Sequence, residues 1–196
     1  MKYFLLNVHH MNQRPSQFPA SEKHRLVDES RVKRQPVEII IERMKLSPNE
    51  IVADLGAGVG YLSIPLADAG VKVIALDIQE EMLDSLRQRD GDSDRITPVK
   101  AELPTIPLPD SSLDRVVMLN VFHEVNDKGK LASEIRRVLR SDGRLTIVDW
   151  QARPTEHGPP FHERIPMNEA PQYFPGFKVE SIYDDENYYH LELSKE

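Results

Sequence analysis

The sequence contains no cysteine, and this absence excludes several kinds of protein. Disulfides, thiolate zinc sites and a cysteine nucleophile all need the missing thiol. No apolar run is long enough to span a bilayer, and the first residues lack the apolar region and cleavage site of a signal peptide. We therefore expect no membrane span and a cytoplasmic location. Repeats and low-complexity tracts are absent too, so the 196 residues predict one domain with a sizeable core.

Positive charge is in short supply, because 25 Lys and Arg residues are outnumbered by 32 Asp and Glu residues, for a net charge of −7. A domain this acidic is a poor candidate for nucleic-acid binding, which depends on clustered cations. Residues 1–45 differ, since they contain nine Lys and Arg but five Asp and Glu. Two interpretations are open: a solvated basic helix, or a basic flap that attracts an anionic substrate. We expect an N-terminal arm and lid over residues 1–35 and a single domain over residues 36–196.

Strand-like and helix-like segments alternate along the chain. Short apolar runs predict buried parallel strands over residues 51–55, 71–77, 96–101, 114–121 and 144–150. Apolar spacing and end signals predict helices over residues 36–45, 61–69, 78–89 and 131–139, the last stopped at Ser-Asp-Gly. Pro98 suggests a short or irregular third strand. A helical piece at 168–173 precedes two strands, 177–183 and 188–194, joined by a turn. The pattern predicts an α/β fold: an open, doubly wound, mostly parallel sheet with a C-terminal antiparallel hairpin.

Three glycines at alternate positions, Gly56, Gly58 and Gly60, follow the first predicted strand. Sheets of this kind bind ligands beyond the carboxyl ends of their strands, so this loop is the expected site. A Walker phosphate loop is excluded, because no Gly-Lys-Ser/Thr follows. A dinucleotide fingerprint, G-x-G-x-x-G, needs its third glycine where Tyr61 stands. This mismatch weighs against a bound pyrophosphate.

Two carboxylates near the loop narrow the ligand further. Asp77 ends the second predicted strand, where a carboxylate can accept hydrogen bonds from ribose hydroxyls. NAD and S-adenosylmethionine share that ribose, so Asp77 indicates only a nucleoside. Asp54 would repel a pyrophosphate but suits a cationic ammonium and sulfonium, which favours S-adenosylmethionine. Alternatives stay open here: the glycines serve only tight packing, and Asp54 and Asp77 cap the helices that follow them.

Four blocks of sequence between residues 46 and 150 carry a family resemblance: VADLGAGVGYLSIPLA, IALDIQEEML, AELPTIPLPDSSLDRVVMLNVFHEV and EIRRVLRSDGRLTIVDW. Through them the sequence resembles the class I S-adenosylmethionine-dependent methyltransferases. More closely, it resembles the small members of the ubiquinone/menaquinone-biosynthesis type. The resemblance implies a Rossmann-like methyltransferase fold, S-adenosylmethionine as cofactor and methyl transfer to an acceptor.

The resemblance also implies which residues bind the methionyl part of the cofactor. Gly56, Gly58 and Gly60 would let the backbone pass beneath it, with Asp54 near its amino group, directly or through water. Asn120, at the end of the fourth strand, would face the methionyl group mainly through its backbone.

For the adenosine part, the resemblance implies four residues. Asp77 would bind the ribose, and Ile78 would lie against the adenine. Glu102, together with the backbone of Ala101, would lie near the adenine amino edge. Relatives usually have an acidic residue followed by alanine here, whereas this chain has Lys100-Ala101-Glu102. Glu102 as a plain surface residue is therefore the alternative.

Methyl transfer is an in-line displacement at a carbon that the sulfonium already activates, so the main tasks of the enzyme are to hold the acceptor in line and to exclude water. A base is needed only if the acceptor must lose a proton. His123 and Glu124 follow the fourth strand on the ligand side and are the candidate catalytic residues. The alternative is that one of them bonds to a neighbouring loop.

Residues near the end of the fifth strand are expected to build the acceptor pocket. Arg164 is a candidate for binding an anionic acceptor, or for pairing with Glu163 or Asp149. His157, His162 and Glu163 fit no standard ligand set, so no metal is assigned.

A small molecule is the expected methyl acceptor. Without cysteine, neither arsenite methylation nor the cysteine-adduct route to 5-methylpyrimidines is available. The Asp/Asn-Pro-Pro-Tyr/Phe motif of amino-methylating nucleic-acid enzymes is absent, and the chain has little room for a recognition domain. An NAD-linked oxidoreductase and a non-catalytic nucleoside-binding sensor or partner protein stay open as alternatives. Nothing in the sequence indicates an oligomeric state.

Overall fold

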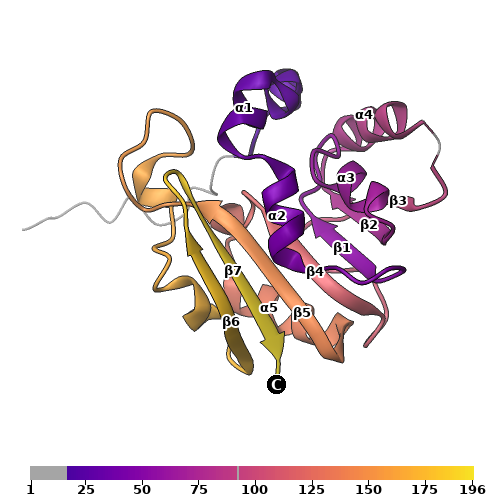
Figure 1. Cartoon of the computed structure of the whole chain (residues 1–196), viewed down its shortest axis with the longest axis vertical. Coiled ribbons are helices and arrows are strands. Elements are labelled where there is room, and N and C mark those ends of the chain that lie inside the picture. The colour runs from indigo at the N-terminus through magenta and orange to yellow at the C-terminus, as the bar shows by residue number, and fades with distance from the viewer. Residues whose placement is uncertain (1–16, 92) are drawn as a thin grey trace, which may run out of the picture.

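A seven-stranded sheet forms the centre of the computed structural model, which describes residues 17–91 and 93–196 (Figure 1). Residues 1–16 of the expected arm lie outside the described residues. The strands are β1 (Ile51–Leu55), β2 (Lys72–Asp77), β3 (Ile96–Lys100), β4 (Leu113–Leu119), β5 (Leu139–Trp150), β6 (Phe177–Asp184) and β7 (Tyr188–Lys195). Their order is β3-β2-β1-β4-β5-β7-β6, parallel from β3 to β5 and antiparallel beyond. The predicted doubly wound sheet with a C-terminal hairpin is confirmed.

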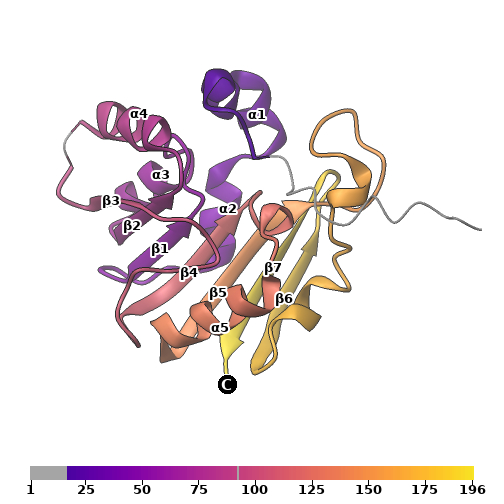
Figure 2. The same cartoon turned by 180° about the vertical axis from the view of Figure 1, so that it is seen from behind.

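Helices cover both faces of this sheet. The α-helices are α1 (Glu29–Arg34), α2 (Val37–Met44), α3 (Ser63–Asp68), α4 (Glu80–Asp90) and α5 (Lys128–Val138). Short 3₁₀ helices are η1 (Ala20–Val27), η2 (Phe122–Glu124), η3 (Phe161–Glu163) and η4 (Ala170–Tyr173). The two opposite views show α2 on one face of the sheet and α5 on the other (Figures 1 and 2). In the described ranges, no helix is long and apolar enough to cross a membrane.

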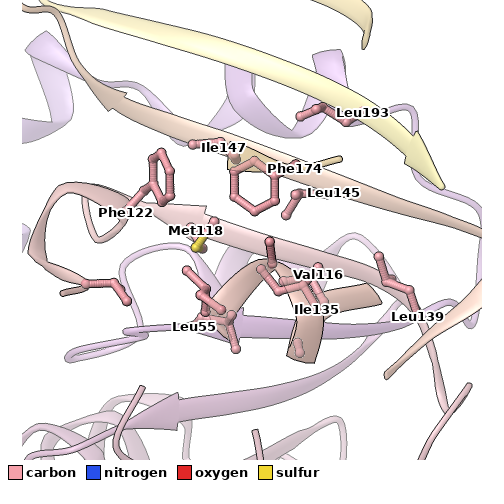
Figure 3. Close-up of a cluster of buried hydrophobic side chains, with 14 of the residues drawn as sticks. Leu55, Val116, Met118, Phe122, Ile135, Leu139, Leu145, Ile147, Phe174 and Leu193 are labelled. Carbon is pink, nitrogen blue, oxygen red and sulfur yellow. The ribbon is translucent and has the colours of Figure 1, made fainter. Parts of the chain in front are cut away.

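Two hydrophobic clusters hold the layers together, one on each face. Neighbouring residues of a strand point to opposite faces, so the continuous apolar run of β4 serves both clusters. Val116 and Met118 pack with Ile135 of α5 and with Phe174 (Figure 3). Val117 packs on the other face with residues of α2 and α3. The sheet is thus fixed from both sides.

The end of α5 differs from the prediction. The helix ends at Val138, and Ser141, Asp142 and Gly143 lie inside β5 instead of stopping a helix. Leu139, expected as the last helical residue, pairs with Leu113 of β4. Two backbone N–H groups just before β4 bond to carbonyls at the end of α5, with N···O distances of 2.9 Å. This pairing draws the chain into the sheet and overrides the local helix-stop signal.

Pro98 lies within β3, which is a regular five-residue strand. It faces Ala75 in the register with β2, and β3 is an edge strand. A proline is tolerated there, because an edge strand needs donors on one side only.

A buried ionic network crosses β4, β5 and β7. The guanidinium of Arg115, which is 1% exposed, donates from Nη1 to Glu192 Oε2 at 3.0 Å. It also donates from Nε to Glu50 Oε2 at 3.4 Å. Thr146 Oγ1 donates to Glu192 Oε1 at 2.8 Å, and His190 Nε2 lies 2.7 Å from the same oxygen. Glu192 is therefore held by three side chains in a region closed to solvent.

Candidate functional site

A cavity of about 1070 Å³ opens at the carboxyl ends of β1, β2 and β4. The strand order reverses between β1 and β4, which is where ligands bind in such sheets. The lining of this cavity includes every residue predicted for the site except Gly60. These residues are Asp54, Gly56, Gly58, Asp77, Ile78, Ala101, Glu102, Asn120, His123 and Glu124. In the described part of the chain, no group of three His, Asp or Glu is placed to hold a metal ion.

All three glycines of the turn after β1 have a positive φ, and at two of them a Cβ would also press on a neighbouring side chain. Gly56 has φ +73°, and a Cβ there would lie 3.0 Å from Val121 Cγ1 and closer still to Cγ2. Gly58, at φ +55°, donates its N–H into the cavity-lining carboxylate of Asp77 at 2.8 Å. Gly60, the residue outside the lining, has φ +80°, and a Cβ would lie 3.0 Å from Leu86 Cγ of α4. Gly60 thus permits close helix packing, and its role beneath a cofactor stays a prediction.

The two carboxylates beside the glycine turn, Asp54 of β1 and Asp77 of β2, are held by hydrogen bonds. Asp54 is 2% exposed, and Ser63 Oγ donates to its Oδ2 at 2.6 Å. Burial raises the pKa of Asp54 to about 6. Asp77 accepts from the N–H groups of Gly58 at Oδ2 and Gln79 at Oδ1, at 2.8 and 2.9 Å. Burial raises the pKa of Asp77, although these backbone N–H groups partly oppose it.

The predicted adenine side lies next to Asp77. Ile78 is half-buried, and the Ala101 N–H donates to the Asp77 carbonyl at 2.9 Å. Glu102 is exposed at the rim of the same cavity. The structure therefore brings all three residues to one end of the cavity, and their contacts with adenine stay predictions.

Asn120 connects the site to the N-terminal segment. Its backbone is left-handed, with φ 60°, and its N–H donates to the Val148 carbonyl. Its side chain exchanges two hydrogen bonds with Gln35, which is 3% exposed, at 2.8 and 3.2 Å. The Gln35 carbonyl also accepts from Tyr61 Oη at 2.7 Å. The sequence carries no signal for Gln35, because 85 residues separate it from Asn120.

His123 is bound to Asp149 at the end of β5. Its Nδ1 lies 2.7 Å from Asp149 Oδ1, and its backbone N–H donates to Oδ2 at 3.0 Å. Burial disfavours the imidazolium, but the charge and hydrogen bond of Asp149 outweigh burial and raise the pKa of His123. Because Nδ1 is taken, Nε2 is the nitrogen left for a ligand. Glu124 Oε1 lies 3.9 Å from Nε2, and burial raises the pKa of Glu124 to about 7.

This pair predicts a measurable titration. We expect the imidazole of His123 to titrate above its ordinary pKa of 6.5 and to titrate lower in Asp149→Asn, because the compensating charge is lost while burial stays. Side-chain NMR, with the signal assigned by its loss in His123→Gln, measures both values. An identical midpoint in wild type and Asp149→Asn would show that Asp149 does not govern this histidine.

The loop after β5 forms a wall of the cavity, and Arg164 holds the loop together. Its guanidinium donates to the carbonyls of Pro159, Arg153 and His157 at 2.9, 2.9 and 3.0 Å. It forms no ion pair with Glu163 or Asp149 among the described residues. Gly158 packs so closely on Trp150 that a Cβ would lie 2.6 Å from the indole. Arg164 is thus a loop-building residue, not the anion-binding or pairing residue considered from the sequence.

Residues before α2 complete the lining of the cavity. They come from the segment before η1, from η1 and from α1: Gln17, Phe18, Pro19, Glu22, Arg25, Leu26, Asp28, Ser30, Arg31 and Arg34. Figure 1 shows α1 standing beyond the strand ends, above the sheet. The described part of the expected lid therefore faces the cavity, and its action as a lid stays a prediction.

Comparisons with known proteins identify a methyltransferase domain in this chain. Residues 53–147 match the model of a methyltransferase domain. A demethylmenaquinone methyltransferase of Clavibacter sepedonicus is 35% identical over 105 residues, which cover 54% of this chain and 43% of that protein. An uncharacterized methyltransferase of Mycobacterium bovis is 40% identical over 102 residues, covering 52% and 40%. This chain spans less than half the length of these two relatives.

Solved structures share the fold over most of this chain. A SAM dependent methyltransferase from Aquifex aeolicus aligns with a TM-score of 0.85 and 26% identity, over 92% of this chain and 100% of that one. An S-adenosylmethionine dependent methyltransferase from Mesorhizobium loti aligns with a TM-score of 0.69 over 82% and 99%, and its 18% identity shows the fold alone. The chain therefore contains a methyltransferase domain over residues 53–147 and has the fold of S-adenosylmethionine-dependent methyltransferases. The match to demethylmenaquinone methyltransferases also confirms the predicted resemblance to the ubiquinone/menaquinone type.

Proposed function

We propose that the protein transfers the methyl group of S-adenosylmethionine to a small-molecule acceptor in the cavity at the strand ends. One observation carries the proposal: Asp54, the glycine turn and Asp77 converge on a single cavity at the reversal of strand order. The cavity of about 1070 Å³ is large for one ligand, since single-ligand pockets measure roughly 300–1000 Å³. There is room for an acceptor beside a nucleoside.

The charges of the site fit this cofactor better than a dinucleotide. Asp54 is a buried carboxylate whose pKa is raised to about 6. A cation beside it would lower that pKa and favour the charged carboxylate. An ammonium or sulfonium supplies that cation, whereas a pyrophosphate would add a second negative charge. Asp77 lines the same cavity, where its carboxylate would accept hydrogen bonds from ribose hydroxyls. When bound, S-adenosylmethionine would supply the activated methyl group.

His123 is proposed as the base for an acceptor that must lose a proton. Asp149 holds its Nδ1, which leaves Nε2 to accept a proton inside the cavity. Asp149 acts as a positioning residue, because it fixes the ring and stabilises the imidazolium. Glu124, with a pKa near 7, is the proposed second proton carrier next to Nε2.

Transfer of a labelled methyl group tests the proposed acceptor class. We expect protein incubated with methyl-labelled S-adenosylmethionine and a cell extract to place label in the low-mass, acid-soluble fraction. Label found chiefly in precipitated protein or nucleic acid would contradict a small-molecule acceptor. The Asp77→Ala variant is the control, since it should lose label transfer with the ribose contact.

Calorimetry separates the remaining alternatives. S-adenosylmethionine and S-adenosylhomocysteine are expected to bind in the micromolar range, as an order of magnitude, and NAD far more weakly. Preferential NAD binding would favour the oxidoreductase. Tight cofactor binding without label transfer to any fraction would favour the non-catalytic sensor.

A further inference from the structure

Arg34, the last residue of α1, lies where two cavities meet. It lines the site cavity of about 1070 Å³ and also a second cavity of about 630 Å³. Trp150 and His157 line both cavities as well, so these three residues form the junction between them. The chemistry proposed above gives no role to this junction or to the second cavity.

The guanidinium of Arg34 has donor capacity left for a ligand. Its Nε is buried and has no hydrogen-bond partner among the described residues. Arg34 acts on the carboxylate of Asp28 through its charge alone. That carboxylate accepts its hydrogen bonds from Ser30 Oγ and from the Arg31 N–H, both at 2.7 Å. A buried donor without an acceptor is costly, and a guanidinium bonds most strongly to an oxyanion, so the junction lacks an anion beside Arg34.

Arg31 and Arg34 lie one turn apart on α1 and act on different parts of the site. Arg31 stacks over the ring of Tyr61, with its guanidinium carbon 4.2 Å from the centroid. Its charge acts on Asp54 beside the glycine turn, whereas the charge of Arg34 does not. An anion beside Arg34 thus fits the acceptor, which shares the cavity with the cofactor, better than the nucleoside.

The end of β5 lies between Arg34 and the candidate base. Asp149 and Trp150 are consecutive strand residues, so their side chains leave β5 on opposite faces. Asp149 holds His123 on one face. On the other face, Trp150 packs against Tyr188 with ring centroids 4.5 Å apart and forms the junction with Arg34. A molecule that reaches both His123 and Arg34 must therefore extend past the end of β5.

The other charged residues of the second cavity leave Arg34 as the cation for an anion at the junction. Arg153 Nη2 lies 3.2 Å from Asp184 Oδ1, and its Nε donates to the Glu186 carbonyl at 2.9 Å. The carboxylates of Glu156 and Glu186 would repel an anion, but both residues are exposed, so water and salt screen their charges. The buried Nε of Arg34 is screened much less.

We propose that the methyl acceptor is an acidic small molecule: Arg34 binds its oxyanion at the junction, and its methyl-accepting group lies toward His123. This inference rests on the proposed function and narrows the acceptor to a chemical class. The oxyanion and the accepting atom lie at different ends of such a molecule, because the end of β5 lies between the residues that bind them. The acceptor therefore keeps its negative charge after methylation.

The charge of the labelled product tests the proposed class of acceptor. Wild-type protein, incubated with methyl-labelled S-adenosylmethionine and a cell extract, should give a low-mass product that an anion exchanger retains at neutral pH. Phosphatase treatment before the column identifies the oxyanion, since a phosphate ester would lose its retention and a carboxylate would keep it. Labelled product in the flow-through, beyond that of a mixture without protein, would overturn the proposal.

The variant Arg34→Gln tests the residue. With dilute extract it should transfer label about tenfold to a hundredfold more slowly than wild type, the range of a charge-assisted hydrogen bond. The deficit should shrink as the extract is concentrated, because the lost contact binds the acceptor. Calorimetry should give the wild-type affinity for S-adenosylhomocysteine, which also verifies that the variant is folded. Lys33→Gln, an equal charge change at an exposed position of the same helix, should transfer label as wild type does.

Two results with Arg34→Gln would also overturn the proposal. A wild-type rate of label transfer at every extract concentration would show that Arg34 does not bind the acceptor. An equal loss of affinity for S-adenosylhomocysteine would show that Arg34 supports α1 or the cofactor site instead. In both cases a labelled low-mass product from wild type would leave the proposed function standing. If wild type labels no low-mass compound, the proposed function fails, and this inference fails with it.

Discussion

Replacing Glu192 by leucine is expected to lower the free energy of unfolding by about 3–5 kcal/mol. Glu192 is buried and accepts from Arg115 and Thr146, at 3.0 and 2.8 Å. Leucine would leave the Arg115 charge inside the sheet, with Glu50 at 3.4 Å as its remaining carboxylate. A buried charge that has lost its ion-pair partner still bears the cost of its lost hydration, and no other interaction compensates for that cost. Urea unfolding, with the midpoint and slope fitted together, measures the loss.

Two further variants show whether charge is the reason. Arg115→Met combined with Glu192→Leu removes both charges and should restore much of the stability, because an apolar pair of similar volume often replaces a buried ion pair at little cost. Glu50→Gln, at a position with an 18% exposed side chain, should cost about 1 kcal/mol or less. A double variant no more stable than Glu192→Leu would assign the effect to packing.

Replacing Gly56 by alanine is the second large effect, expected at about 2–5 kcal/mol of unfolding free energy. A left-handed backbone costs an L-residue roughly 1–2 kcal/mol, and overpacking adds roughly 1–3 kcal/mol. Both apply at Gly56, where φ is +73° and the new Cβ would press on the side chain of Val121. Val121 lines the cavity, so its displacement should also weaken S-adenosylhomocysteine binding. Thermal unfolding and calorimetry on one preparation measure the two effects.

Gly70 offers the matched control for this substitution. It has φ +92°, and a Cβ there would meet nothing within 4 Å. Gly70→Ala should therefore show the backbone cost alone, about 1–2 kcal/mol, with unchanged ligand binding. If both alanines cost the same, the contact with Val121 is not what requires glycine at position 56.

The parts of the site that the sequence predicted are those set by local geometry. Gly56, Gly58 and Asp77 lie at the ends of adjacent parallel strands. Once β1 and β2 are assigned correctly, these residues come together whatever the remaining strands do. The predicted strand order also placed His123 and Asp149 at the carboxyl ends of neighbouring strands. It did not predict that they bond, since a hydrogen bond depends on side-chain directions that a strand boundary leaves open.

What the sequence did not predict depends on distant partners. Arg31 and Gln35 belong to a segment judged only by its charge, and their contacts with Tyr61 and Asn120 cross the fold. Arg115 resembles an ordinary surface cation until Glu192 of β7 is placed beside it. The Ser-Asp-Gly run misled for the same reason, because pairing with β4 outweighed its local preference for ending a helix.

The strand order β5-β7-β6 has a consequence for the emerging chain. During synthesis β6 leaves the ribosome before β7, yet β7 is the strand that joins β6 to the sheet. Until β7 arrives, the edge of β5 is open, and Arg115 and Thr146 have no Glu192 to bind. Exposed edges of this kind are prone to pair with other chains. From the synthesis of β5 until that of β7, the nascent protein therefore carries an open strand edge that can pair with other chains.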